Sequence, residues 1–347
     1  MKNILKRKLG RSGIEVSPMG LGCWAIGGNI FMQGLPLGWS TVDDNESLKA
    51  LEKGLEMGVN FIDTADMYGT GHSEKLVGEA IKGKRDKVVI ATKFGFTFEP
   101  GSREILSMEG DGSPEYIRKA VEDSLSRLQT DYIDLYQLHL GEYPMDKAQQ
   151  TRDALEELVK AGKIRSYGWS TDDFERAAFF AEGENCAAIQ QIFNLFVGNK
   201  NILQLCEEKN LASINRGPLA MGLLTGKFST ETNLPKDDVR SILHNFADEY
   251  HIFFSEGKPV KKLLDKLDAI RDILKSNGRT LAQGALAWLW ARSENTIPIP
   301  GFKTVKQVEE NAGAMQFGPL TSEQMKEIDL ILHKEQDYIS NIQKPII

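Results

Sequence analysis

The sequence predicts an α/β fold, a single (β/α)8 TIM barrel over residues 1–347 with an N-terminal β-hairpin and long loops on the C-terminal face. Three observations support this prediction. Short apolar segments alternate with amphipathic segments of helical period, which is typical of repeated βα units around a parallel sheet. The apolar segments number eight, as a closed barrel requires. No polar linker or internal repeat marks a domain boundary.

The eight expected strands are short apolar runs: 19–23, 60–63, 88–92, 132–138, 164–169, 187–191, 211–215 and 296–299. A closed barrel is favoured over an open doubly wound sheet, because the first strand-to-helix junction, GLGCWAIGG (20–28), lacks the GxGxxG spacing. The two-layer Rossmann arrangement is the alternative. Before the first strand, residues 6–19 with Ser12-Gly13 in the middle predict a hairpin that plugs the bottom of the barrel.

Helix boundaries between the strands are indicated by capping residues. Ser113 and Pro114 supply a cap acceptor and a preset φ ahead of one apolar helical face, formed by Ile117, Val121, Leu125 and Leu128. Glycines that follow periodic stretches are expected to end helices in the left-handed conformation: Gly58, Gly83, Gly162 and Gly278. Trp288 and Trp290 lie in an apolar helical stretch and are interpreted as packing between helix and barrel.

Three strand-to-helix connections are long, at about 25–43, 94–113 and 227–259. In a barrel all three lie on the C-terminal face, where active sites are found, and long loops in compact domains are usually functional or disordered. We therefore expect them to form the wall and lid of a pocket.

Composition narrows the classes of partner. The 42 basic and 49 acidic residues give a formal charge of −7, so no basic field would attract nucleic acid or an anionic membrane. No apolar stretch has the length of a signal peptide or of a membrane span. Three widely spaced cysteines, Cys23, Cys186 and Cys206, are typical of a reducing compartment. The expected location is the cytoplasm.

Four chemically capable side chains follow successive expected strands. Asp63 ends the second strand and Tyr68 lies in the loop after it, whereas Lys93 ends the third and His139 the fourth. A phenol with a pKa of about 10 is a poor acid catalyst, but a neighbouring ammonium such as Lys93 lowers that pKa. Asp63 would keep the lysine charged and oriented. His139 could donate a hydrogen bond to a carbonyl oxygen or relay a proton.

Each of these residues also has a structural interpretation. A single loop Tyr is most often packing, a Lys at a strand end is most often solvated, and a single His is most often a satisfied hydrogen-bonding group. Their occurrence together at one expected rim favours a catalytic group. No second His or nearby Cys accompanies them, so no metal site is predicted.

These residues lie in motifs that resemble those of the aldo-keto reductase family. The motifs, in the family's order and spacing, are NFIDTADMYGTGHSEKLVGEAI (60–81), KVVIATKFG (87–95), DYIDLYQLHL (131–140), PLAMGLLTGK (218–227) and IPIPGFKTVKQVEEN (297–311). The resemblance implies an NADP-dependent oxidoreductase that reduces carbonyls with NAD(P)H and needs no metal. In that scheme Tyr68 is the acid, Lys93 and Asp63 set its pKa, and His139 orients the carbonyl.

The resemblance also implies a site for the adenosine end of the cofactor, formed by Gly301, Lys303, Gln307, Glu310 and Asn311. Thr304 and Gln307 fit a capping box, and a helix N-terminus on this face can bind phosphate. Lys303 and Thr304 beside the ribose 2′ position favour NADPH over NADH, because an extra phosphate needs donors and positive charge.

At the nicotinamide end, the resemblance places Ser170 and Gln190 on the carboxamide and Trp24 in the pocket wall, with core packing as the alternative for Trp24. Lys227 and Arg240 match a loop over the pyrophosphate, and solvated surface charge is the alternative for both.

The chain also departs from the family at this end of the cofactor site. An aromatic residue often precedes a Ser-Pro-Leu segment in the family, and here the segment is Arg216, Gly217, Pro218 and Leu219. The guanidinium of Arg216 can stack on the ring, but its charge is expected to favour the reduced cofactor. Leu140-Gly141 replaces the frequent Trp-Pro after His139, which would open the substrate pocket.

The function predicted is therefore an NADPH-dependent reductase of a small aldehyde or ketone. Two alternatives remain at this point. A barrel of this family can serve as a slow, NADPH-binding sensor subunit, like the potassium-channel β subunits it resembles. Lys93 could instead form a Schiff base in an aldolase-like barrel. A salt bridge with Asp63 would oppose that second alternative, since a charged lysine is a poor nucleophile.

Overall fold

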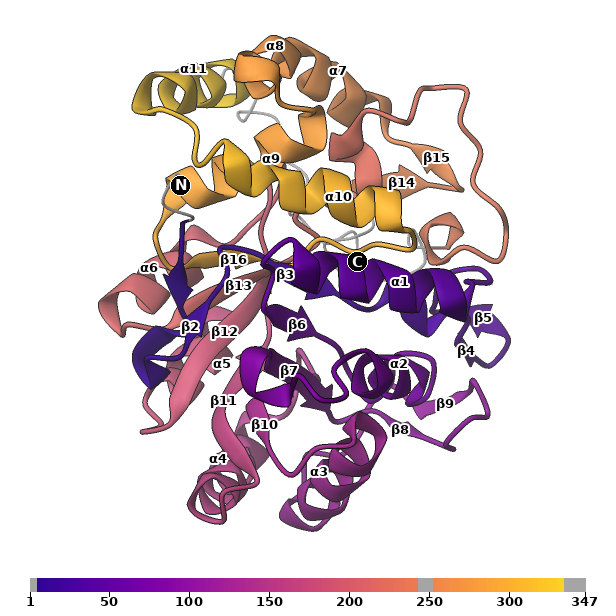
Figure 1. Ribbon diagram of the computed structural model, residues 1–347, viewed down its shortest axis with the longest axis vertical. Coiled ribbons are helices and arrows are strands. Elements are labelled where there is room, and N and C mark those ends of the chain that lie inside the picture. The colour runs from indigo at the N-terminus through magenta and orange to yellow at the C-terminus, as the bar shows by residue number, and fades with distance from the viewer. Residues whose placement is uncertain (1–4, 243–251, 334–347) are drawn as a thin grey trace, which may run out of the picture.

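The computed structural model describes residues 5–242 and 252–333, and its centre is one sheet of eight parallel strands (Figure 1). The strands, in chain order, are β3 (Gly20–Gly22), β6 (Phe61–Asp63), β7 (Val89–Phe94), β10 (Ile133–Leu138), β11 (Ile164–Ser170), β12 (Cys186–Ile192), β13 (Ala212–Arg216) and β16 (Thr296–Pro298). Each strand pairs with the next one in the chain. A bridge between Gly22 and Gly301 joins the last strand to the first. The predicted barrel is confirmed, and the open Rossmann alternative is wrong.

Helices surround this sheet (Figure 1). They are α1 (Asp44–Glu56), α2 (His72–Ala80), α3 (Pro114–Leu128), α4 (Met145–Lys160), α5 (Phe174–Ala181), α6 (Lys200–Glu208), α7 (Lys261–Ala269), α8 (Arg271–Leu274), α9 (Leu281–Arg292), α10 (Val305–Gly313) and α11 (Ser322–His333). The cap predicted for α3 is confirmed, because the Ser113 hydroxyl accepts the Tyr116 amide and Pro114 is the first helical residue. Positive φ angles confirm the four glycines expected at helix ends: Gly58, Gly83, Gly162 and Gly278.

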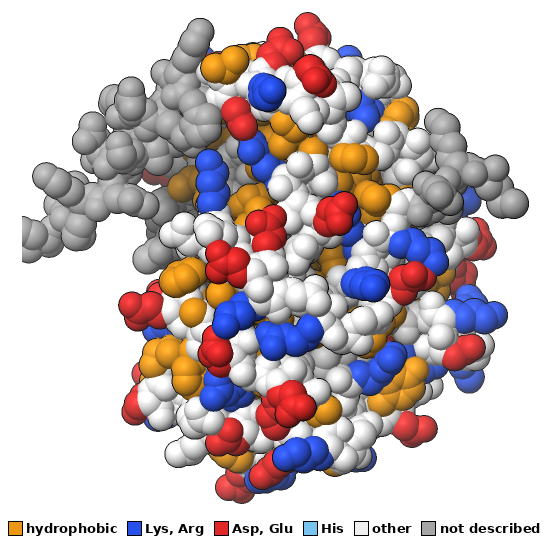
Figure 2. All heavy atoms as spheres, turned by 90° about the vertical axis from the view of Figure 1, so that its left-hand side faces the viewer, with side chains coloured by type: hydrophobic (Ala, Val, Ile, Leu, Met, Phe, Trp, Pro, Cys, Tyr) orange, Lys and Arg blue, Asp and Glu red, His pale blue; other side chains and the backbone are white. Residues whose placement is uncertain are grey.

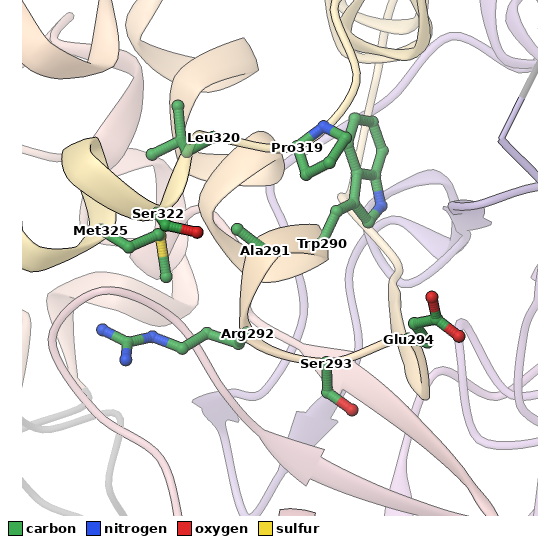
Figure 3. Close-up of a pocket in the computed structure, with 9 residues that line it drawn as sticks. All are labelled: Trp290, Ala291, Arg292, Ser293, Glu294, Pro319, Leu320, Ser322 and Met325. Atoms are coloured by element: carbon green, nitrogen blue, oxygen red, sulfur yellow. The ribbon is translucent and has the colours of Figure 1, made fainter.

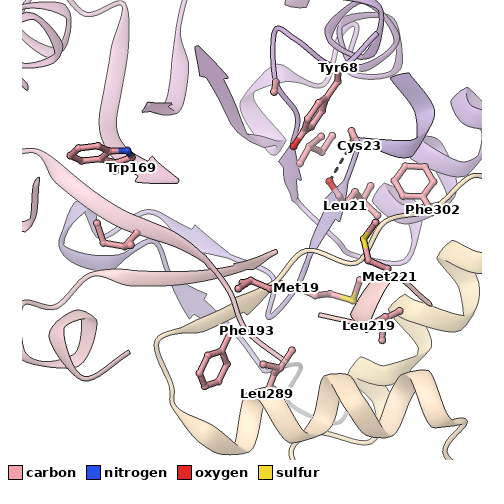
Figure 4. Packing of buried hydrophobic residues seen from close by; sticks show 14 of the residues in the cluster. Met19, Leu21, Cys23, Tyr68, Trp169, Phe193, Leu219, Met221, Leu289 and Phe302 are labelled. Atoms are coloured by element: carbon pink, nitrogen blue, oxygen red, sulfur yellow. Dashed lines mark hydrogen bonds between the residues drawn. The ribbon is translucent and has the colours of Figure 1, made fainter. Parts of the chain in front are cut away.

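Helix α9 is buried over almost its whole length against the barrel. The Trp288 ring stacks on Phe193 with centroids 5.9 Å apart, and the Trp290 indole donates a hydrogen bond to the Pro18 carbonyl at 2.7 Å. Figure 4 shows Leu289 of the same helix beside Phe193. The interpretation of both tryptophans as packing residues is confirmed.

The N-terminal hairpin is formed by β1 (Arg7–Lys8) and β2 (Glu15–Val16). Its apolar residues Leu9, Ile14 and Val16 join an interior cluster contributed by the barrel strands: Phe61, Val89, Ala91, Leu135, Ala187, Ala188, Ala212, Ile214, Ile297 and Ile299. The hairpin therefore plugs the barrel at its N-terminal end, on the left of Figure 1, as predicted.

The contact between the hairpin tip and the strands depends on Gly10. Its φ is +48°, and a Cβ at this position would lie 2.2 Å from the Ala187 carbonyl oxygen. We expect Gly10→Ala to lower the free energy of unfolding by about 3 kcal/mol, because the new methyl must displace backbone. Gly13→Ala is the matched control: its φ is +70° but nothing lies within 4 Å of the added Cβ. The Gly13→Ala variant should lower the free energy of unfolding by only about 1 kcal/mol. Urea denaturation measures both, and equal losses would contradict the plug contact.

Each of the three long loops carries a small hairpin, on the right of Figure 1. These hairpins are β4 (Phe31–Met32) with β5 (Leu35–Pro36), β8 (Thr97–Phe98) with β9 (Ile105–Ser107), and β14 (Phe254–Ser255) with β15 (Lys258–Pro259). The first loop contacts both others: the Phe31 amide donates to the Arg103 carbonyl at 2.7 Å, and the Val239 amide donates to the Gly38 carbonyl at 3.1 Å. Residues 243–251 of the third predicted loop lie outside the described residues.

The opposite, N-terminal end of the barrel faces the viewer in Figure 2, where acidic and basic side chains are interspersed. A hollow of about 480 Å³ lies at this end, between the end of α9 and the segment leading into α11 (Figure 3). It is remote from Tyr68, which lies at the other end of the strands. In the ranges 5–242 and 252–333, no helix combines the length and apolar character that a bilayer crossing needs. The three cysteines are buried and unpaired.

Candidate active site

The structure brings Asp63, Tyr68, Lys93 and His139 together at the C-terminal end of the barrel. The Lys93 ammonium donates to Asp63 Oδ1 at 2.6 Å, to the Tyr68 hydroxyl at 3.3 Å and to the Thr64 carbonyl at 2.8 Å. Its side chain is 0% exposed. Lys93 lies within β7, which extends to Phe94 and so is longer than predicted. A buried cation is thus held between a carboxylate and a phenol.

Asp63 is held by side chains from two further strands. Its Oδ2 accepts a hydrogen bond from Gln190 Nε2 on β12 at 2.8 Å and a longer one from Gln137 Nε2 on β10 at 3.4 Å. The Gln190 amide therefore contacts Asp63 in the barrel interior, and its expected contact with the nicotinamide carboxamide stays a prediction. The sequence interpretation missed Gln137, although a glutamine inside the apolar segment DYIDLYQLHL was a detectable signal.

Aromatic rings surround the phenol and the imidazole. The Tyr68 and His139 rings meet edge to face with centroids 5.8 Å apart, and Phe96 packs on the other side of His139 at 5.3 Å. Trp24 stacks on Tyr68 at 6.2 Å and meets Trp39 at 5.6 Å. Trp24 therefore lies beside the Tyr68 ring, and its role as a wall of the pocket stays a prediction.

His139 is held in its neutral form. Burial lowers the pKa of its imidazole well below the usual value, and the positive charges of Lys93 and Arg216 lower it further. Within the described residues its Nδ1 atom is buried without a hydrogen-bond partner. A neutral imidazole offers one donor and one acceptor nitrogen, which suits it to orient a carbonyl group.

A second cluster of charged side chains lies behind the Tyr68 loop, between β7, α2 and α3. Glu74 accepts the Arg127 guanidinium at 2.6 Å and the Thr92 hydroxyl at 2.6 Å. Asp66 is buried beside this pair and accepts the Met67 amide at 2.6 Å. Burial raises the pKa of Asp66 well above its usual value, Glu74 raises it further, and Arg127 opposes the shift. Both carboxyl groups interact with the charge of one arginine, so Asp66 stays protonated to a higher pH than an ordinary aspartate.

Two tyrosines face the same cluster. Tyr116 donates its hydroxyl to the Phe96 carbonyl at 2.8 Å, and Tyr136 stacks on Phe94 with centroids 4.6 Å apart. Burial is the largest cause that raises the pKa of each phenol, and Asp66 adds to it. Both tyrosines therefore remain neutral beside Asp66.

The protonated state of Asp66 makes stability depend on pH. The folded pKa lies above the unfolded value of about 3.9, so the stabilising contribution is complete below the unfolded pKa and is lost as pH rises through the folded pKa. Asp66→Asn is neutral at every pH, so its free energy of unfolding relative to wild type should rise as the pH increases from about 4 through the folded pKa of Asp66. Urea denaturation across that range measures the difference. Asp66→Ala, which removes the Met67 acceptor, should be less stable than the asparagine variant throughout, and a difference independent of pH would contradict the argument.

Arg240 and Lys303, two of the three cations expected near a cofactor, lie close to the Trp39 ring. Arg240 is 8% exposed, pairs with Asp238 at 2.6 Å and lies 4.7 Å from the Trp39 ring centroid. The alternative interpretation of Arg240 as a solvated charge is therefore wrong. Lys303 lies 5.6 Å from the same ring. Burial lowers the pKa of Lys227 and of Lys303, and Arg240 contributes to both shifts.

The N-terminus of α10 lies next to these cations. Thr304 caps the helix by accepting the Gln307 amide at 3.3 Å, whereas the Gln307 side chain accepts the Lys303 amide at 2.7 Å. The predicted capping box is thus formed with its second half shifted by one residue. Asn311 is buried and its Nδ2 lies 3.5 Å from the Gly301 carbonyl, so these two expected residues are also neighbours. Glu310 lies later on α10, where its carbonyl accepts Gln283.

The expected nicotinamide residues lie at the ends of β11 and β13. Ser170 ends β11, and Arg216 ends β13. The segment after Arg216 turns back into the protein: the Gly217 carbonyl accepts Asn194 Nδ2 at 2.9 Å, and Pro218 and Leu219 are buried. Figure 4 shows Leu219 beside Met221 in the core, so its side chain is a packing element.

Arg216 has a counterion that the sequence interpretation missed. Its guanidinium forms an ion pair with Asp172, which follows β11. The expected preference of the Arg216 charge for the reduced cofactor stays a prediction, and this counterion acts on the same charge. A polar residue just after a strand end was the available signal, but nothing in the sequence indicated its partner.

Comparisons with known proteins agree with this geometry. A profile described as the aldo/keto reductase family matches residues 18–333. The chain is 34% identical to the Bacillus subtilis protein named aldo-keto reductase YhdN, over 92% of this chain and 91% of that one. It is similar in structure to the glycerol dehydrogenase AKR11B4 from Gluconobacter oxydans, with a TM-score of 0.78 and 32% identity over 99% and 98% of the two chains. A Klebsiella pneumoniae aldo/keto reductase in complex with NADP and acetate gives a TM-score of 0.67 and 27% identity over 94% and 95%.

Proposed function

Because the chain belongs to the aldo/keto reductase family, we propose that it reduces a small aldehyde or ketone with NADPH and that Tyr68 is the general acid. The observation that carries the proposal is the buried Lys93 ammonium, which bridges the Asp63 carboxylate and the Tyr68 hydroxyl. This arrangement supplies a phenol that can lose its proton, and it does so beside a neutral imidazole.

The roles of the four residues follow from their contacts. Tyr68 donates its hydroxyl proton to the substrate oxygen, and the Lys93 charge 3.3 Å away stabilises the phenolate that remains. Asp63 keeps Lys93 protonated in the apolar interior. His139 donates a hydrogen bond to the same oxygen and orients the carbonyl. Donors that are already oriented at a developing alkoxide usually give the largest catalytic contribution. When bound, NADPH supplies the hydride.

The cations around Trp39 support NADPH over NADH. Lys227, Arg240 and Lys303 lie within electrostatic reach of one another, and partial burial disfavours the charged form of Lys303, whereas Lys227 is exposed. An anion bound among these cations would stabilise their charged forms, and the additional 2′-phosphate of NADPH is such an anion. Lys303 also begins the segment that caps α10, whose N-terminus favours phosphate.

Further cofactor contacts are proposed by resemblance to the family. Gly301, Thr304, Gln307, Glu310 and Asn311 would contact the adenosine end. Ser170, Gln190 and the segment 216–219 would contact the nicotinamide, and Trp24 would line the pocket beside it. The salt bridge of Lys93 opposes the aldolase-like alternative, because an ammonium paired at 2.6 Å has no lone pair for attack on a carbonyl.

The test follows NADPH and, separately, NADH oxidation by absorbance with aromatic aldehydes, methylglyoxal, sugars and pyridoxal. We expect at least one aldehyde to be reduced, with NADPH the better cofactor. Tight NADPH binding without turnover on the whole panel would contradict the reductase and favour the sensor alternative. A borohydride-trapped adduct on Lys93 would favour the Schiff-base alternative instead.

A further inference from the structure

The ion pair between Arg216 and Asp172 lies on the rim that carries the proposed chemistry. Arg216 ends β13 and Asp172 follows β11, and their side chains are 22% and 13% exposed. The carboxylate is fixed in place, because its Oδ1 accepts the Ile192 amide at 2.7 Å while its Oδ2 accepts the guanidinium. The Asp172 carbonyl accepts Asn199 Nδ2 at 3.2 Å, which anchors the backbone as well.

The positive charge of Arg216 acts on His139, one of the proposed catalytic residues. It is one of the positive charges that lower the pKa of His139, so the guanidinium lies within electrostatic reach of the imidazole. Any charged group that binds on this rim therefore interacts with both members of the pair. A counterion in contact with the guanidinium leaves a dipole with no net charge, and the field of a dipole falls off faster than that of a single charge.

We propose that Asp172 is a specificity-determining residue that sets the ratio of affinities for NADP+ and NADPH by cancelling the charge of Arg216. The inference rests on the proposed function, in which Arg216 contacts the nicotinamide. The oxidised nicotinamide ring carries a positive charge and the reduced ring is neutral. An unopposed guanidinium would repel only the oxidised form, whereas the pair with Asp172 repels neither form strongly.

The counterion of Arg216 affects which directions of the reaction are open to the enzyme. Oxidation of an alcohol requires that NADP+ bind, and an isolated arginine would weaken that binding. Asp172 therefore keeps both directions of the reaction available to the enzyme.

A double-mutant cycle tests the inference. Dissociation constants of NADP+ and NADPH are measured by calorimetry for wild type, Asp172→Asn, Arg216→Gln and the double variant. Asp172→Asn retains an oxygen that can accept the Ile192 amide and removes the carboxylate charge beside the guanidinium, so the ratio of the NADP+ constant to the NADPH constant should rise about tenfold. Arg216→Gln leaves the carboxylate unopposed and should lower the ratio about tenfold. The double variant should return to about the wild-type ratio.

Asp173→Asn is the matched control. Asp173 adjoins Asp172, but it caps α5 and pairs with Arg176 at 3.0 Å. Asparagine is an equally good N-cap, so this variant should leave the ratio unchanged.

The outcomes separate this inference from the proposed function. If wild type binds neither cofactor, the proposed function fails. If wild type binds both and Asp172→Asn leaves the ratio unchanged, the role of Asp172 is overturned. Should Asp172→Asn fail to fold, Arg216→Gln decides, because an unchanged ratio in that variant also overturns the inference.

Discussion

Tyr68→Phe is expected to lower kcat by about 10³-fold while NADPH affinity stays within about twofold of wild type. The phenol is the group placed to donate a proton, 3.3 Å from the Lys93 ammonium, and the variant removes only that oxygen. The ring remains and can still stack on Trp24. Steady-state rates with the best aldehyde and calorimetric NADPH binding measure the two effects separately.

Tyr167→Phe is the matched control for this substitution. Its hydroxyl also makes a short hydrogen bond, to Glu156 at 2.6 Å, but the ring packs on Phe180 of α5, outside the barrel interior. We expect kcat to be unchanged in that variant. Equal losses in the two variants would indicate a general effect of removing a hydroxyl, and loss of NADPH binding in Tyr68→Phe would argue against an acid role.

Lys93→Met should abolish turnover and also destabilise the protein by about 3 to 5 kcal/mol. The salt bridge with Asp63 is buried, so removal of the ammonium leaves a carboxylate without a counterion in the barrel interior. The two amides of Gln137 and Gln190 remain as donors to Asp63, but neither carries a charge. Urea denaturation measures the free energy of unfolding.

Two further variants distinguish a buried pair from a general effect of losing a lysine. Lys119 pairs with Asp123 on the surface and its side chain is 75% exposed, so Lys119→Met should cost less than about 1 kcal/mol. The double variant Lys93→Met, Asp63→Asn should recover part of the lost stability without turnover, since it removes the unpaired charge. A stable Lys93→Met protein would show that Asp63 does not depend on this cation.

Features set by neighbouring residues could be predicted from the sequence. The Ser113 cap of α3 and the glycine at Gly58 after α1 depend on hydrogen bonds and φ angles within a few residues. Strand positions followed from apolar runs, because a strand in a parallel sheet is covered on both faces. The convergence of Asp63, Lys93 and His139 followed from topology, since the C-terminal ends of barrel strands share one rim.

The partners of charged and polar groups could not be predicted in this way. Gln190 and Asp63 are 127 positions apart, and their contact depends on which residues of two strands point into the barrel at the same level. Arg216 and Asp172 are 44 positions apart and belong to different strand ends. The sequence places Arg240 in a long loop, where a solvated charge was one interpretation. In the structure, Trp39 from another loop packs against the Arg240 guanidinium.

By itself, then, the sequence determined the eight βα units, their caps and the four residues that meet at the rim, because local hydrogen bonding and apolar periodicity decide these features. Only the tertiary structure decided the counterion of Arg216, the orientation of Gln190 and the protonation preference of Asp66. The physical reason is that these depend on burial and on charges brought close by barrel closure, and both are properties of the packed chain.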